Sequence, residues 1–169
     1  SFVQQIVVTD TGSADRTIEI AEAAGALVVS FPWQDDFSSA RNECLRHATG
    51  DWVLVLDADE RLAPGAAQVI RQAIERGEFD CGLLPIHNAS HIAATPEQIM
   101  SGMARRNDPV LLPRLFRRTK DLKWDGVVHE NVTHWLAKGR VAKAIDAAIL
   151  HLGNVPRIRE ERAKSKRNL

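Results

Sequence analysis

Short apolar runs alternate with helix-like segments through the first half of this chain. The runs lie at residues 4–10, 26–31, 52–56 and 79–86, and they are rich in the β-branched and aliphatic residues typical of buried strands. Strands and helices that alternate with short connections form right-handed crossovers in a mostly parallel sheet, with helices on both faces. The sequence therefore predicts an α/β fold.

Three helices are expected between these strands. Ser13 is expected to cap the first, and Ser38 or Ser39 the second, because serine hydroxyls accept hydrogen bonds from free N–H groups at a helix start. Pro64 fits the first turn of the third helix. That helix has an apolar stripe at helical spacing, formed by Ala66, Val69, Ile70, Ala73 and Ile74.

The second half of the chain has a different pattern. Residues 88–108 show weak periodicity and are expected to form a long loop with a short helix. Strand-like pieces follow at 110–118, 126–135 and 147–153, and antiparallel pairing is open to them. The tail at 156–169 is expected to be a solvated helix, because it is basic and has few apolar residues.

Composition and charge exclude several classes of protein. The 22 basic residues balance the 22 acidic ones, so the overall charge favours no nucleic-acid partner. No apolar run approaches the ~20 residues of a membrane-spanning helix. Cys44 and Cys81 are isolated, and we expect both to be core residues of a reduced protein. We expect a cytoplasmic location, with peripheral attachment to the inner face of the membrane left open.

The third apolar run leads straight into three acids, Asp57, Asp59 and Glu60. Ligands of open α/β sheets bind beyond the carboxyl ends of the strands, where these acids lie. Asp57 and Asp59 are two residues apart, so on an extended segment they point the same way. Their repulsion is relieved by a cation, and a hard divalent cation keeps positions open for phosphate oxygens. The plainer alternative, that the acids begin the following helix, conflicts with the later position of Pro64.

One long segment of the chain is VVTDTGSADRTIEIAEAAGALVVSFPWQDDFSSARNECLRHATGDWVLVLDADERL, and it resembles the nucleotide-sugar-binding half of family 2 glycosyltransferases. The later segments PRLFRR, WDGVVHENV and ILHLG resemble landmarks of one bacterial branch of that family. The resemblance implies a GT-A fold, the Rossmann-like fold of nucleotide-diphospho-sugar transferases, over residues 1–155. Residues 1–87 would form the nucleotide-binding half, and residues 88–155 the acceptor and catalytic half.

The same resemblance implies an inverting glycosyltransferase that takes a sugar from a nucleotide-diphosphate donor. Uridine is the expected base, and Mn²⁺ or Mg²⁺ is the expected cofactor. The acceptor, which could be a saccharide, a lipid-linked molecule or a peptide, is not specified by the sequence. We expect no nucleic-acid partner.

Five residues match positions of the family that have a role. Asp10 would contact the nucleotide base, and a carboxylate can accept from a ring N–H of uracil. Arg41 would contact the nucleotide or diphosphate, Asp57 would lie near the ribose, and Asp59 would bind the metal. Glu130 would be the catalytic base, which takes the proton of the acceptor. The plainer alternatives are an Asx turn for Asp10, a solvated helix charge for Arg41 and a surface acid for Glu130.

Other polar residues have weaker assignments. His151, near the end of the last predicted strand, is expected to contact the metal or the diphosphate, with a structural role equally open. Arg114 and Arg117 are expected to face phosphate, acceptor or solvent. His129 is expected to point away from the face of its neighbour on an extended segment, and Glu60 has no assigned role.

The strand and loop that open the domain in this family are missing from the sequence. We therefore expect an N-terminally truncated domain: either the sequence is a fragment, or another segment or chain covers the resulting sheet edge. One rival hypothesis is a truncated, non-catalytic domain that binds nucleotide or acts as a scaffold. Another is a haloacid dehalogenase-type phosphatase with Asp57 as nucleophile, but Glu60 and Arg61 stand where that class has small residues.

Overall fold

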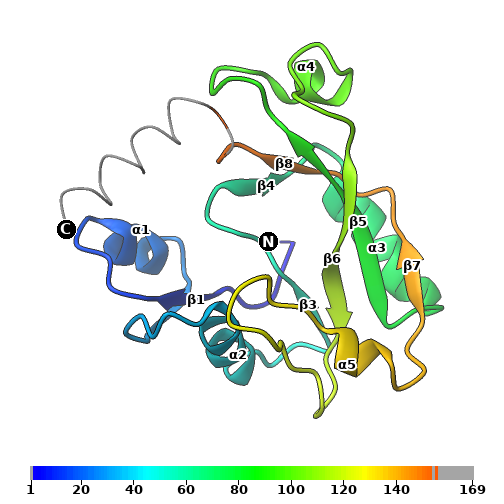
Figure 1. The fold of residues 1–169 in the computed structure, drawn as a ribbon. Coiled ribbons are helices and arrows are strands. Elements are labelled where there is room, and N and C mark those ends of the chain that lie inside the picture. Colours follow the sequence, from blue (N-terminus) through cyan, green and yellow to red (C-terminus); the bar gives the residue numbers. More distant parts are fainter. Residues whose placement is uncertain (1, 154, 156–169) are drawn as a thin grey trace. The chain divides into compact units, whose positions relative to one another are not determined.

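The computed structural model describes residues 2–153 and residue 155 (Figure 1). The chain divides into two compact units. The first unit contains the residues up to Val53 together with Arg117–Arg140, and the second contains Leu54–Phe116 with the described residues after Arg140. The helix predicted at 156–169 lies outside the described residues. None of the helices that the structure describes is long and apolar enough to cross a membrane.

The first unit opens with the predicted strand–helix–strand arrangement. β1 (Val7–Asp10) pairs in parallel with β2 (Leu27–Ser30), and α1 (Thr17–Ala23) connects them (Figure 1). α1 packs on β2, and α2 (Phe37–Arg46) packs on β1. Because parallel strands need a crossover connection, the alternation of strand and helix patterns predicts this part of the fold correctly.

The helix starts of the first unit differ from the predicted ones. Ser13 does not cap α1, which begins only at Thr17. Asp36 caps α2, and its carboxylate accepts from the backbone N–H of Ser39 at 3.1 Å and from the hydroxyl of Ser38 at 2.8 Å. An N-cap carboxylate also interacts favourably with the helix dipole, so Asp36 takes the place predicted for a serine.

The later part of the first unit contains a closed loop where a strand was expected. The prediction of a strand at 126–135 is wrong, because residues 125–131 form a loop and α5 (Thr133–Leu136) follows it. Two backbone hydrogen bonds of 2.9 Å between Asp125 and Asn131 close the loop, which we call the 125–131 loop. Within it His129 has a φ of 59°, a left-handed conformation that an extended strand cannot contain.

The second unit is built around a mixed sheet. Its ladder runs in the order β6 (Val110–Arg117), β5 (Cys81–Asn88), β8 (Ile149–His151) and β4 (Glu60–Leu62), and β7 (Ala142–Ala144) also pairs with β5 (Figure 1). β7 and β8 run parallel to β5, whereas β6 is antiparallel to β5 and β4 is antiparallel to β8. The antiparallel pairs therefore join β6 to β5 and β8 to β4, and among the described residues the late strand-like pieces do not pair with one another as the sequence left open. Neither β4 nor β7 was predicted.

Two helices of the second unit agree with the sequence analysis. α3 (Ala66–Arg76) has the expected amphipathic stripe, from which Ile70 is fully buried. Pro64 does not begin this helix, because Gly65 is its N-cap, with a left-handed φ of 83°. α4 (Pro96–Met100) is the short helix expected between residues 88 and 108.

Buried side chains of the second unit come mainly from its sheet. They include Cys81, Leu84, Leu115, Phe116, Ile149 and Leu150. The prediction that Cys81 is a core residue is confirmed, and Cys44 in the first unit is partly buried. This buried sheet positions the polar residues at the ends of β5 and β8 and at the start of β4.

Candidate active site

The acids that follow the third strand lie on a turn of the second unit. β3 (Trp52–Leu54) is shorter than predicted and ends before these acids. The backbone N–H of Glu60 donates to the carbonyl oxygen of Asp57 at 2.9 Å, and Glu60 then begins β4. The expectation that Asp57 and Asp59 share a direction along an extended segment is therefore wrong, and each acid has its own partners.

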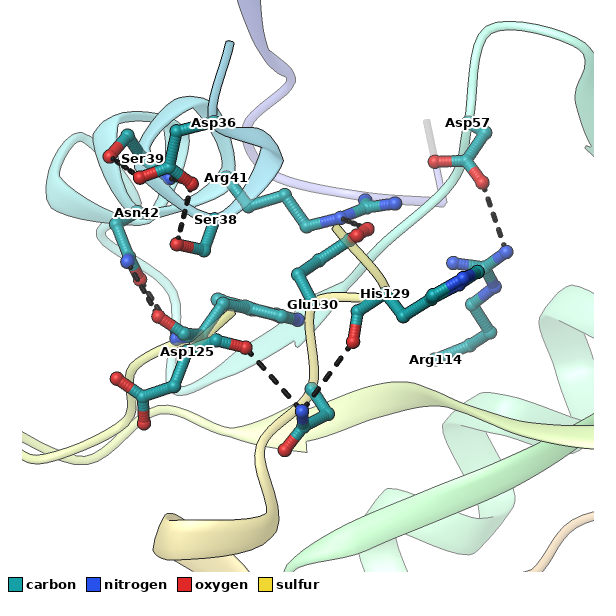
Figure 2. Close-up of polar contacts among 12 residues, drawn as sticks. Asp36, Ser38, Ser39, Arg41, Asn42, Asp57, Arg114, Asp125, His129 and Glu130 are labelled. Atoms are coloured by element: carbon teal, nitrogen blue, oxygen red, sulfur yellow. Dashed lines mark hydrogen bonds and ion pairs between the residues drawn. The ribbon is translucent and has the colours of Figure 1, made fainter. Parts of the chain in front are cut away.

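Asp57 forms an ion-pair cluster with Glu60 and Arg114. Nη2 of Arg114 lies 3.0 Å from Oδ2 of Asp57, as Figure 2 shows, and 2.6 Å from Oε1 of Glu60. The second oxygen of Glu60, Oε2, accepts from the backbone N–H of Asp57 at 3.0 Å. The side chains of Glu60 and Arg114 are only 2% and 11% exposed. Arg114, for which phosphate, acceptor and solvent were all open, therefore faces the acids.

A β-bulge aims Arg114 at this turn. In the antiparallel pair of β5 and β6, Gly82 is opposite Leu115 and Leu83 is opposite Pro113, which leaves Arg114 as the extra residue. A bulge re-aims a side chain because the inserted residue breaks the alternation of the two faces. Pro113 has no N–H to offer to the ladder, so an irregular register costs less here than elsewhere in the strand.

Asp59 faces His151 within the second unit. Oδ2 of Asp59 lies 3.4 Å from Nε2 of His151, and both side chains are largely buried. The sheet register produces this approach, since His151 is opposite Glu60 in the β4–β8 pair and opposite Asn88 in the β5–β8 pair. The structure thus places the two residues expected at the metal beside each other, while Asp57 contacts Arg114 instead.

Asn88 sets the orientation of the His151 ring. Its Oδ1 lies 2.7 Å from Nδ1 of His151, and its Nδ2 donates to Oδ1 of Asn107 at 3.2 Å. A neutral imidazole with its hydrogen on Nδ1 presents the lone pair of Nε2 to the Asp59 carboxylate. Two acceptors that face each other need a proton or a cation between them. An imidazole nitrogen and a carboxylate are groups that can hold a divalent metal, and an amide hydrogen-bonded to the far ring nitrogen fixes the orientation of such an imidazole.

Gly153 lines the space beside these two side chains. A Cβ atom at this position would lie 2.7 Å from Cγ of Asp59 and 2.9 Å from Nε2 of His151. Within residues 2–153 and 155, no three His, Cys, Asp or Glu side chains gather into a complete metal site. Asp59 and His151 therefore fit a metal as two protein ligands, and phosphate oxygens and water would have to supply the others.

In the first unit, Asp10 is buried at the end of β1. Its carboxylate accepts from the backbone N–H of Gly12 at 3.1 Å and from that of Ser13 at 3.2 Å. Hydrogen bonding from the Ser13 side chain, followed by these backbone N–H groups, lowers the pKa of Asp10 despite its burial. The Asx-type turn raised as an alternative is present, and the contact with a nucleotide base stays a prediction.

Arg41 and Glu130, both in the first unit, pair with each other. Nε of Arg41 lies 2.6 Å from Oε1 of Glu130, and both side chains are mostly buried (Figure 2). Neither residue is the solvated surface charge that the plainer alternatives required. Because the 125–131 loop turns at His129, the prediction that His129 lies on an extended segment is wrong.

The helix that carries Arg41 also holds the loop that carries Glu130. The side chain of Asn42 makes two hydrogen bonds of 2.9 Å to the backbone of Trp124, one to its carbonyl and one from its N–H. At the start of α2, the backbone N–H of Phe37 donates to the carbonyl oxygen of Val127 at 3.1 Å. The loop that carries Glu130 is thus held by α2 at Trp124 and Val127, both of which precede Glu130 in the sequence.

Comparison with known proteins decides the family. The sequence profile of the family described as Glycosyl transferase family 2 matches residues 3–140. The chain belongs to this family. The haloacid dehalogenase-type phosphatase raised as a rival is therefore not retained.

Two curated relatives are much longer than this chain. It is 38% identical over 130 residues to a TPR repeat-containing protein of Synechococcus elongatus, covering 77% of this chain and 29% of that protein. It is 26% identical over 179 residues to the SPbeta prophage-derived glycosyltransferase SunS of Bacillus subtilis, covering 98% of this chain and 37% of that protein. The chain thus spans about a third of the length of these relatives.

Solved structures confirm the GT-A fold. Residues 1–349 of TarS from S. aureus match with a TM-score of 0.61 at 15% identity, over 88% of this chain and 51% of that one. HddC from Yersinia pseudotuberculosis matches with a TM-score of 0.53 at 11% identity, over 96% of this chain and 79% of that one. At these identities the likeness concerns the fold of this family 2 chain alone.

Several residues that shape the site were missed in the sequence. Asn88 is the last residue of the apolar strand β5, and Asp57 comes shortly after β3, so the pattern of a polar residue at a strand end could have identified Asn88. Asn42 stands directly after Arg41. Gly153 carried no recognisable signal, because its importance depends on which side chains approach it in space.

Proposed function

We propose that this family 2 chain is the donor-binding and catalytic domain of an inverting, metal-dependent glycosyltransferase. Its donor is a nucleotide-diphosphate sugar with a uridine base. The observation that carries this proposal is the approach of Asp59 and His151 at 3.4 Å, with the imidazole held from behind by Asn88. Membership of the family makes a sugar nucleotide the natural ligand of such an arrangement.

Asp59 and His151 would hold Mn²⁺ or Mg²⁺. When bound, the metal supplies positive charge that stabilises the leaving diphosphate. Asp57 is proposed to lie near the ribose, and its pairing with Arg114 keeps its carboxylate in one place. Mn²⁺ fits this pair of ligands better than Mg²⁺, because Mg²⁺ strongly prefers oxygen ligands.

Glu130 is proposed as the general base. It accepts the proton of the acceptor hydroxyl as the acceptor oxygen forms its bond to the anomeric carbon and the bond from that carbon to the diphosphate oxygen breaks. The ion pair with Arg41 holds the carboxylate in a defined orientation before substrates bind. Positioning of this kind contributes to catalysis because the base need not be oriented during the reaction. Asp10 is proposed to contact the base, and Arg41 to contact the nucleotide or diphosphate.

A thermal melting experiment tests the metal–nucleotide site. At 100 times its dissociation constant, a ligand stabilises the folded state by about 2.7 kcal/mol, which raises the melting temperature of a chain of this size by roughly 5–10 °C. We expect MnCl₂ with UDP to produce this shift in the unmodified protein and in Glu75→Ala, an exposed acid on α3. Asp59→Ala and His151→Ala should remove it.

Two results would separate this proposal from its rivals. No shift with MnCl₂ and UDP, in a protein that is folded by circular dichroism, would contradict the metal–nucleotide site. A full shift without release of UDP from UDP-sugars, tested with saccharide, lipid-linked and peptide acceptors, would favour the non-catalytic nucleotide-binding or scaffold domain.

A further inference from the structure

Glu60 is the acid for which sequence reasoning found no role. The structure assigns it one: we propose that Glu60 is a positioning residue, which acts with Arg114 to hold the 57–60 turn in the shape that presents Asp59 to the metal. This inference rests on the proposed function, because it concerns the same metal site.

Burial indicates that the Glu60–Arg114 pair has a role other than stability. Both charges are almost completely removed from water. A buried ion pair contributes little net stability, since desolvation of the two charges offsets their attraction. The main effect of the pair is therefore on geometry: it fixes the shape of the turn that bears Asp57 and Asp59.

The two oxygens of Glu60 serve two different donors. Oε1 accepts from Nη2 of Arg114 at 2.6 Å, and Oε2 accepts from the backbone N–H of Asp57 at 3.0 Å. A glutamine at this position offers one acceptor and one donor group, so its NH₂ would face either the guanidinium or the Asp57 N–H. Only a carboxylate at this distance from the backbone satisfies both donors.

The turn is held at both of its ends. Glu60 fixes the Asp57 end through the N–H bond, and Arg114 adds a contact of 3.0 Å to the Asp57 carboxylate. At the other end, the carbonyl oxygen of Asp59 accepts from the backbone N–H of Leu152 at 2.9 Å, next to His151 on β8. Rotation of the turn about the Leu152 contact is opposed by Glu60, and such a rotation would move Asp59 away from His151.

A backbone irregularity in β6 produces this arrangement. Arg114 is the bulged residue of β6, and its carbonyl oxygen accepts from the backbone N–H of Val55 at 2.8 Å. Opposite the bulge, a Cβ on Gly82 would lie 2.7 Å from Cδ1 of Ile145, so only glycine fits there without rearrangement. Pro113, Gly82 and the bulge together bring one guanidinium to Glu60 and Asp57.

Binding of MnCl₂, measured by titration calorimetry with and without UDP, tests the inference. Glu60→Gln is expected to weaken Mn²⁺ binding by about 10- to 100-fold, the effect typical of residues that orient metal ligands. The matched control, Glu75→Gln, makes the same chemical change on the exposed face of α3 and should bind Mn²⁺ like the unmodified protein. In turnover assays, Glu60→Gln should raise the Mn²⁺ concentration needed for half-maximal rate and recover most of kcat at saturating Mn²⁺.

Three outcomes decide the matter. Unchanged Mn²⁺ binding by folded Glu60→Gln, alongside lost binding by Asp59→Ala, would overturn the role of Glu60 and leave the proposed function standing. Unchanged binding by Asp59→Ala itself would remove both proposals. If Glu60→Gln does not fold, Glu60→Asp takes its place. It keeps the charge, but its side chain is one methylene shorter and cannot hold both Arg114 and the Asp57 N–H, so wild-type Mn²⁺ affinity in that folded variant would equally refute the positioning role.

Discussion

Replacing Gly153 by alanine should damage the proposed metal site with little change elsewhere. The φ of Gly153 lies outside the left-handed region, so alanine is compatible with the backbone at this position. The new Cβ would lie 2.7 Å from Cγ of Asp59 and 2.9 Å from Nε2 of His151. Oδ2 of Asp59 would lie nearer still. Ordinary contacts between such atoms are about 3.5–4 Å, so the Asp59 carboxylate must move by at least about 1 Å.

That displacement is large on the scale of metal coordination. Metal–ligand distances tolerate deviations of about 0.2 Å, so a carboxylate displaced by ~1 Å no longer coordinates in its original geometry. We expect the Mn²⁺ affinity to fall by about 10- to 100-fold, which corresponds to roughly 1.4–2.8 kcal/mol of binding free energy. The His151 ring is held by Asn88 at 2.7 Å, so Asp59 is the side chain expected to move.

Titration of MnCl₂ followed by calorimetry measures this effect, with circular dichroism to show that the variant is folded. Gly50→Ala is the matched control, because its Cβ would lie 3.3 Å from the carbonyl oxygen of Trp52 in the first unit and needs a shift of only a few tenths of an ångström. Wild-type Mn²⁺ affinity in Gly153→Ala, together with lost affinity in Asp59→Ala, would refute the steric reasoning.

Three further predictions concern the catalytic base and the Cys81 thiol. Glu130→Gln keeps an acceptor for Arg41 but cannot take a proton. We therefore expect the rate of sugar transfer to fall by about 10²–10⁴-fold, while the melting shift with MnCl₂ and UDP is retained. A transfer rate equal to that of the unmodified protein would exclude Glu130 as the base. Burial raises the pKa of the Cys81 thiol to about 11, so a thiol reagent at pH 8 should modify Cys81 only after denaturant is added. The folded-state pKa of Cys81 exceeds the ordinary thiol value of about 8.5. The folding stability that comes from this shift is therefore complete below pH ~8.5 and is lost as the pH rises towards 11. Urea unfolding at several pH values would detect this loss.

The sequence by itself determined the family and most of the early elements in their order, but not the strand β4. Apolar runs and helical stripes report which residues are buried, and burial follows a period of two in strands and 3.6 in helices, so short windows of sequence are enough to read them. The same reasoning identified Asp59 and His151 as polar residues at strand ends, and the resemblance to the family supplied Arg41 and Glu130. Where the local pattern was weak, as at 126–135, the prediction of a strand was wrong.

Only the tertiary structure decided which side chains meet. The bulge that turns Arg114 towards Glu60 depends on the register between β5 and β6, and a register is set by contacts between residues far apart in the chain. The approach of Asp59 to His151, and the lack of room for a Cβ at Gly153, follow from the pairing of β4 with β8. A local pattern can show that an acid ends a strand, but the group that the acid faces is decided by long-range packing.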